Sequence, residues 1–112
     1  MSLSYPLSKI AIEQLKIKVI DALKSVYDPE IRVNIYDLGL IYTIAIDPQG
    51  SARLEMTLTT PNCPVAETLP STVNNAVAGV DGITDSAVEL VWDPPWTTEK
   101  VSEAAKLELG IL

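Results

Sequence analysis

The only cysteine of the chain, Cys63, lies in the segment "TTPNCPV" between two prolines. We expect a strand to end just before this segment and a helix to begin near Pro64, because proline suits the first position of a helix. A thiol at the amino end of a helix has a lowered pKa and forms more of the reactive thiolate at neutral pH. The alternative is a buried, unreactive side chain, which is common for free cysteine. Position alone leaves both interpretations open, and the flanking prolines favour a presented thiol slightly.

Polar side chains beside the cysteine and upstream of it could complete a site. Thr59, Thr60 and Asn62 carry hydroxyl and amide groups close to the sulfur in sequence. Asp28 and Glu30 flank a proline, and such paired carboxylates can bind a cation or act as acid and base. Their spacing alone favours a plainer role, in which they end the first helix and cap a turn.

Two further candidates lie in predicted loops. Asp37 stands two residues before a glycine, a pattern that is frequent in Asx turns. The segment 93–97, "DPPWT", is predicted to be a stiff loop in which Trp96 could wall a pocket. A simpler interpretation is a rigid connector between a strand and a helix, with the tryptophan in the core. The residues alone favour the structural interpretation for both candidates.

Composition argues against several classes of function. The chain has 112 residues, with 15 acidic and 8 basic side chains and a net charge of -7, so we expect no nucleic-acid or anionic membrane partner. The absence of histidine removes Ser-His-Asp and Cys-His catalysis and a Cys/His zinc site within one chain. A single cysteine cannot form an internal disulfide. No membrane span or signal-peptide pattern is recognisable, so we expect a cytoplasmic protein.

Hydrophobic periodicity predicts a single small domain, residues 1–112, of the α/β (α+β) class. The expected elements are a helix at 8–25, strands at 40–46 and 52–59, a helix from about 64 to 79 or 82, a strand at 87–91 and a helix at 102–109. The two adjacent strands should form a hairpin through the turn at 47–50. Pro70 is awkward inside the second helix, so we expect a kink there or a restart with Ser71 as the cap. The order α-β-β-α-β-α indicates a two-layer fold.

The first predicted helix is unusually apolar. Ile10, Ile17 and Ile20 widen the buried face that the regular spacing defines. Deep burial of the whole helix is the plainer interpretation, and the alternative is that part of the helix covers a second subunit.

Three segments together resemble one family. They are "DPEIRVNIYDLGLIY" (28–42), "MTLTTPNCP" (56–64) and "VWDPPWT" (91–97). In this order and spacing they are similar to the small metal–sulfur cluster biosynthesis proteins that include SufT, PaaD and the cytosolic iron–sulfur targeting factors. The resemblance extends over about residues 9–110. It implies an iron–sulfur cluster assembly domain-like fold, with helices packed on one face of a small mixed sheet.

The resemblance also implies a role in maturing iron–sulfur proteins, with Cys63 as the central residue and the expected cluster ligand. It reverses the structural interpretation of Asp28 and Glu30, which are expected to line the same surface as the cysteine. The side chains expected to shape the site are Asp28, Glu30, Asp37, Thr59, Thr60, Asn62, Pro64 and Trp96. The expected partners are an iron–sulfur scaffold and client proteins, and a homodimer is expected because family members often form dimers.

Ligand counting narrows this expectation. An iron–sulfur cluster usually takes four thiolates, or thiolates plus histidines, and this chain has one sulfur ligand and no imidazole. The cofactor would therefore be a transient iron–sulfur cluster, shared between the Cys63 residues of two subunits or with a partner. We predict a cluster maturation or carrier protein, not an enzyme. The alternatives are an adaptor that binds no metal, and a thiol- or metal-dependent enzyme that uses Cys63 with Asp28 and Glu30.

Overall fold

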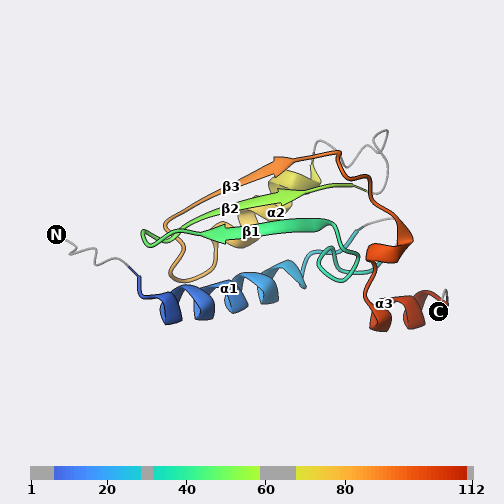
Figure 1. Cartoon of the computed structure of the whole chain (residues 1–112), viewed down its shortest axis with the longest axis horizontal. Coiled ribbons are helices and arrows are strands. Elements are labelled where there is room, and N and C mark those ends of the chain that lie inside the picture. Colours follow the sequence, from blue (N-terminus) through green and yellow to red (C-terminus); the bar gives the residue numbers. More distant parts are fainter. Residues whose placement is uncertain (1–6, 29–31, 59–67, 111–112) are drawn as a thin grey trace.

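The computed structural model describes residues 7–28, 32–58 and 68–110 (Figure 1). The elements are α1 (Lys9–Leu23), β1 (Ile41–Ile46), β2 (Ser51–Met56), α2 (Leu69–Ala78), β3 (Asp85–Leu90), the 3-10 helix η2 (Thr98–Lys100) and α3 (Glu103–Leu109). The predicted order of helices and strands is confirmed. The short helix η2 was not predicted, because three residues are too few to show a hydrophobic period.

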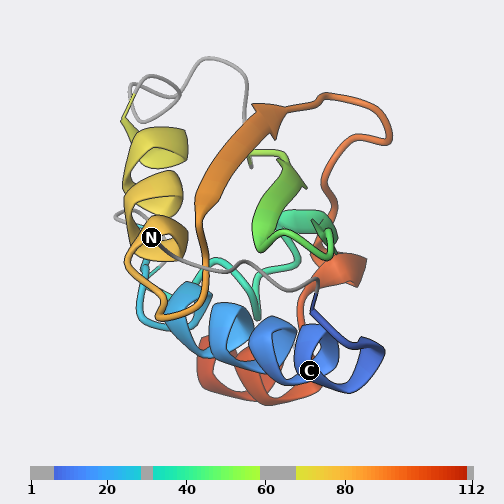
Figure 2. The same cartoon turned by 90° about the vertical axis from the view of Figure 1, so that its left-hand side faces the viewer.

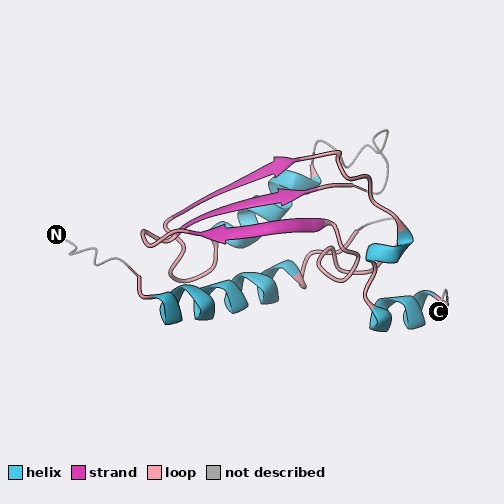
Figure 3. Ribbon diagram, viewed as in Figure 1, coloured by secondary structure: helices cyan, strands magenta, loops and turns pink. Residues whose placement is uncertain are grey.

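The three strands form one mixed sheet in the order β1-β2-β3 (Figure 3). β1 and β2 are antiparallel and make the predicted hairpin, whereas β2 and β3 are parallel and are joined through α2. The pairing of β1 with β2 is irregular between Ile41 and Thr43, so Tyr42 lies at a bulge. A bulge bends a strand and redirects its side chains, which matters for the cavities described below.

One face of the sheet is buried and the other is open. Along β2, Leu54 is buried whereas Arg53 is exposed, as expected for a strand with one covered face. The helices cover that face with stripes of residues spaced four apart, which are Leu15, Val19 and Leu23 on α1 and Leu69, Val73 and Val77 on α2. Figure 2 shows α2 against the sheet and α1 running below it. The two-layer arrangement with helices on one face is confirmed.

The expectation that α1 is deeply buried all round is wrong. Ile10 is 72% exposed and Ile17 is 61% exposed, and Ile20 is only partly buried. These side chains leave the helix away from the stripe centred on Val19. No described element of the chain covers them, so α1 presents apolar side chains to solvent.

The amino end of α2 differs from the expectation. The helix begins at Leu69 with Pro70 in its first turn, where a missing N–H costs no helical hydrogen bond. Thr68 holds the N-cap position, so the predicted restart capped by Ser71 is wrong. Gly79 ends the helix, as expected. The expected helix start near Pro64 falls in residues 59–67, which lie outside the described part of the chain.

Candidate functional site

The parallel strands β2 and β3, which α2 connects, bring several segments to one end of the sheet. The N–H of Val91 donates to the carbonyl of Met56 at 2.8 Å, and the N–H of Thr57 donates to the carbonyl of Leu40 at 2.8 Å. The carboxyl ends of β2 and β3, the start of β1 and the start of α2 therefore lie at the same end of the molecule (Figure 1). Carboxyl ends of parallel strands are where α/β sheets commonly place their sites.

Most of the predicted site lies outside the described residues. The site residues outside the described ranges are Glu30, Thr59, Thr60, Asn62, Cys63 and Pro64. Their predicted roles remain predictions. What the structure describes is the frame around them, together with Asp28, Asp37 and Trp96.

Asp28 is a buried carboxylate. Only 3% of the residue is exposed. Its N–H donates to the carbonyl of Val33 at 3.0 Å, and its own carbonyl accepts from the N–H of Arg32 at 2.9 Å. Arg32 has a positive φ of 66°, which closes this tight turn after α1. Acidic side chains are rarely buried without a specific reason, so the position distinguishes Asp28 from an ordinary helix-ending residue.

Asp37 has a clear structural role. Its carboxylate accepts a hydrogen bond from the amide of Asn34 at 2.8 Å, and its N–H donates to the amide oxygen of Asn34 at 2.8 Å. Its carbonyl accepts from the N–H of Ser102, the N-cap of α3, at 2.8 Å. The Asx turn expected at Asp37 is wrong, because the N–H of Gly39 donates to the carbonyl of Tyr36 and the side chain that accepts a backbone N–H is that of Asn34. The contacts of Asp37 bring α3 to the turn that precedes β1.

Trp96 also connects two distant segments. Its indole N–H donates to the carbonyl of Leu38 at 2.7 Å, and its ring packs against the hydrophobic core. These contacts agree with the interpretation of the 93–97 loop as a rigid connector. Trp96 does not line the cavity that the same loop helps to form.

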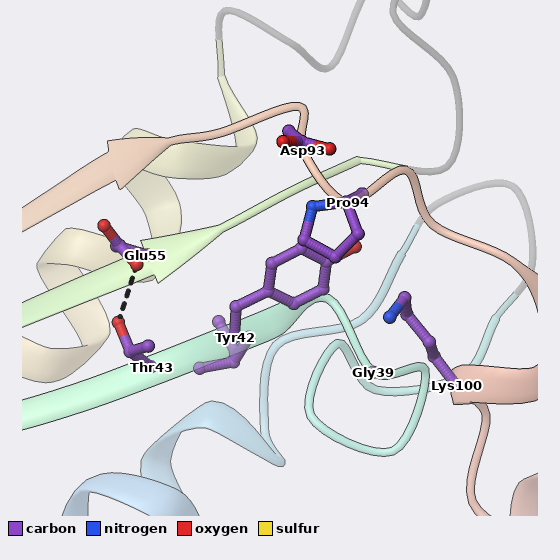
Figure 4. Close-up of a pocket in the computed structure, with 8 residues that line it drawn as sticks. Gly39, Tyr42, Thr43, Glu55, Asp93, Pro94 and Lys100 are labelled. Atoms are coloured by element: carbon purple, nitrogen blue, oxygen red, sulfur yellow. Dashed lines mark hydrogen bonds between the residues drawn. The ribbon is translucent and has the colours of Figure 1, made fainter.

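That cavity, about 560 Å³ in volume, lies where the 93–97 loop crosses the start of β1 (Figure 4). Its lining residues are Gly39, Ile41, Tyr42, Thr43, Glu55, Asp93, Pro94 and Lys100. Tyr42 projects toward Pro94 and donates a hydrogen bond to its carbonyl at 2.7 Å. The ammonium of Lys100 lies 5.0 Å from the centre of the Tyr42 ring. Sequence reasoning missed this cavity, because its walls are far apart along the chain and neither motif alone predicts their contact.

Tyr42 links this cavity to the end of β2. Burial raises the pKa of the Tyr42 hydroxyl above its usual 10.0, the hydroxyl of Thr57 lowers it, and the carboxylate of Asp93 raises it further. Thr57 is 1% exposed. Its hydroxyl affects Tyr42 without forming a hydrogen bond of good geometry to it or to another group of the described chain. Thr57 is thus a buried polar group just ahead of the segment that carries Cys63.

The described ranges contain no group of three or more cysteine and acidic side chains arranged to hold a metal ion. The only thiol of the chain, Cys63, lies outside these ranges. Among the described helices, none is long and apolar enough to span a bilayer.

A sequence model described as "Iron-sulfur cluster assembly protein" matches residues 16–90. The chain is 42% identical over 99 residues to the Fe-S protein maturation auxiliary factor YitW of Bacillus subtilis, covering 88% of this chain and 97% of the relative. It is 38% identical over 86 residues to the Fe-S protein maturation auxiliary factor SufT of Staphylococcus aureus, covering 77% of this chain and 98% of the relative. An iron-sulfur cluster carrier protein of Mycobacterium bovis shares 39% identity over 69 residues, which are 62% of this chain and 18% of that protein.

Solved structures agree with the fold. A domain of unknown function, DUF59, from Bacillus anthracis superposes with a TM-score of 0.86 at 35% identity, covering 94% of this chain and all (100%) of that one. The conserved hypothetical protein TM0487 from Thermotoga maritima superposes with a TM-score of 0.74 at 36% identity, covering 96% of this chain and 99% of that chain.

Proposed function

The chain belongs to the iron–sulfur cluster assembly protein family, and from that premise we propose that it acts as a maturation factor whose Cys63 takes one coordination position on a cluster in transit. The observation that carries this proposal is the similarity to maturation auxiliary factors over 88% of the chain. The cluster is cargo in this proposal, because a single sulfur cannot hold one as a resident cofactor.

The frame of the site supports Cys63 as the working residue. Five positions separate it from Leu58 and five from Thr68, so an extended chain keeps its Cα within roughly 18 Å of either residue. Leu58 and Thr68 both lie on the side of the molecule where β2 ends and α2 begins. In this proposal Cys63 acts at that end of the molecule.

The remaining ligands must come from elsewhere. Two Cys63 residues meeting in a homodimer, or one Cys63 joined by thiolates of a scaffold or client protein, would bring the count toward the four that a cluster usually takes. Asp28 and Glu30 would border the site in this proposal, and the buried position of Asp28 supports that role. The protein would pass its cargo on without turning over a substrate, in the cytoplasm.

The test is complementation in a bacterial strain that lacks its own maturation auxiliary factor. The readout is the activity of a [4Fe–4S] hydro-lyase per unit of hydro-lyase protein. The wild-type chain is expected to restore activity, and Cys63→Ser is not. A variant that combines Cys63→Ser with Thr98→Cys, an exposed position outside the site, keeps one thiol in the chain and is also expected to fail. Full rescue by Cys63→Ser would favour an adaptor that binds no metal.

A further inference from the structure

A groove runs between α1 and the outer side of the edge strand β1. It has a volume of about 320 Å³ and is lined by Lys16, Ile20, Tyr36, Ile41, Tyr42, Thr43 and Ile44. It shares Ile41, Tyr42 and Thr43 with the larger cavity under the 93–97 loop. The two hollows therefore meet at the bulge in β1, and we call them together the β1 groove. The described residues that line it come from α1, the segment 36–44, Glu55 and the segment 93–100.

Basic side chains gather along the β1 groove. Lys16 lines it, the ammonium of Lys24 lies 5.6 Å from the centre of the Tyr36 ring, and that of Lys100 lies 5.0 Å from the centre of the Tyr42 ring. These are three of the eight basic residues in a chain with 15 acidic ones. Within the described ranges, none of the three ammonium groups forms an ion pair with a carboxylate.

The three lysines form a local concentration of positive charge in an acidic chain. Nearby carboxylates would be the ordinary partners on a folded surface. Lys24 and Lys100 lie against tyrosine rings instead, an arrangement that stabilises an ammonium group weakly and leaves its donors available. The carboxylates that line the groove, Glu55 and Asp93, belong to the larger cavity. The part of the groove beside α1 is therefore basic and fits an anionic ligand.

The rest of the groove is apolar and lies beside an unpaired strand edge. Ile20, Ile41 and Ile44 are only partly buried, and Ile17, one turn before Ile20 on α1, is 61% exposed. β1 pairs with β2 on one side only in the described sheet. An extended segment in this position can place alternate side chains in apolar pockets and meet free backbone groups of the edge strand.

We propose that the β1 groove binds an extended segment of a partner protein in which acidic and aliphatic side chains alternate. The acidic side chains pair with Lys16, Lys24 and Lys100, and the aliphatic ones pack on the isoleucines. This inference goes beyond the role of Cys63, because the groove is separate from the cysteine in sequence and needs no cluster. The carboxylates of Glu55 and Asp93, at the far end of the groove, would repel an acidic segment that ran past Tyr42. We therefore expect the acidic side chains to stay on the side of Tyr42 that faces Lys100 and α1, away from Glu55 (Figure 4).

The test uses an acetylated, amidated octapeptide that alternates glutamate with valine or leucine, titrated into the full chain by calorimetry at low ionic strength. One variant combines Lys16→Gln, Lys24→Gln and Lys100→Gln. The matched control combines Lys18→Gln, Arg53→Gln and Lys106→Gln, which removes the same charge from positions outside the groove. Thermal melts establish that both variants are folded.

The groove variant is expected to bind the octapeptide about tenfold more weakly than the wild type, because it loses three surface ion pairs together. The control variant is expected to change affinity less than about twofold, and a peptide with lysine in place of glutamate is expected not to bind. Equal weakening in both variants, or no saturable binding of the octapeptide, would overturn the proposal. So would sedimentation showing a dimer that only the groove variant dissociates, since a second copy would then be the occupant.

Discussion

At the scale of single residues, Trp96 shows how one hydrogen bond can hold a loop in place. Its indole donates to the carbonyl of Leu38 across 58 positions of sequence, while the ring packs on the core. The bond holds the 93–97 loop over the start of β1. The contact is structural, so it should be separable from the chemistry at Cys63.

We predict that Trp96→Phe lowers the free energy of unfolding by at least about 1 kcal/mol, because phenylalanine keeps a smaller aromatic ring in the core and leaves the Leu38 carbonyl without its donor. Urea unfolding measures this change. Complementation by this variant should stay at the wild-type level. A loss of complementation at unchanged stability would instead assign Trp96 to the functional site.

Tyr42 gives a pH-dependent prediction. Its pKa is raised in the folded protein, chiefly by burial, so the folded state holds the phenolic proton more tightly than the unfolded state does. The corresponding stability is fully present below pH 10 and is lost as the pH rises through the folded pKa. Tyr42→Phe should therefore lose less stability than the wild type above pH 10.

The matched control for Tyr42 is Tyr27→Phe, which changes an exposed tyrosine. At neutral pH, Tyr42→Phe should also cost about 1 kcal/mol through the lost bond to the Pro94 carbonyl. Chemical denaturation at several pH values measures both effects. Parallel curves of stability against pH for wild type and Tyr42→Phe above pH 10 would contradict a raised pKa of Tyr42 in the folded protein.

At the scale of elements, Gly39 joins the turn before β1 to η2. Its φ is +79°, and a Cβ atom there would collide with the backbone carbonyl oxygen of Lys100. Only glycine tolerates both the left-handed backbone and the close approach. This contact places Lys100 beside Tyr42 and so forms one wall of the larger cavity.

We predict that Gly39→Ala lowers the free energy of unfolding by roughly 3 kcal/mol, through backbone strain and the clash together. Gly110→Ala is the matched control, because Gly110 has a similar φ of +74° but no atom within 4 Å of the place that a Cβ would occupy. It should cost only about 1 kcal/mol. Thermal or urea unfolding of the two variants measures the difference. Equal costs would show that the contact with Lys100 does not determine the requirement for glycine.

Local patterns predicted which elements form, and long-range contacts decided the remainder. The spacing of Leu15, Val19 and Leu23 was enough to predict α1 and its buried face. The exposure of Ile10 and Ile17 depends on what covers the helix, which its own sequence does not contain. The cavity at Tyr42 depends on a contact with Pro94, 52 positions away. The candidate site was predicted mainly by resemblance, and the residues beside Cys63 remain outside the described chain.

At the scale of the whole molecule, two surfaces of the protein would have separate functions. Cys63 would handle the cargo at the end of the sheet where β2 stops, and the β1 groove would select an acidic partner. Because the chain carries a net charge of -7, general attraction to acidic proteins is absent, and binding should depend on the local arrangement of three lysines. The two activities should therefore respond to different substitutions.

The proposed handling of cargo depends on Cys63 taking one position on a shared, transient cluster. The most direct measurement is anaerobic reconstitution with iron and sulfide, with absorbance, iron per chain and oligomeric state recorded for wild type and Cys63→Ser. We predict that the wild type gains the visible sulfur-to-iron absorption with fewer clusters than chains, and that Cys63→Ser stays colourless at an unchanged melting temperature. Equal iron and equal colour in the two proteins, or a wild type that remains colourless, would contradict the claim.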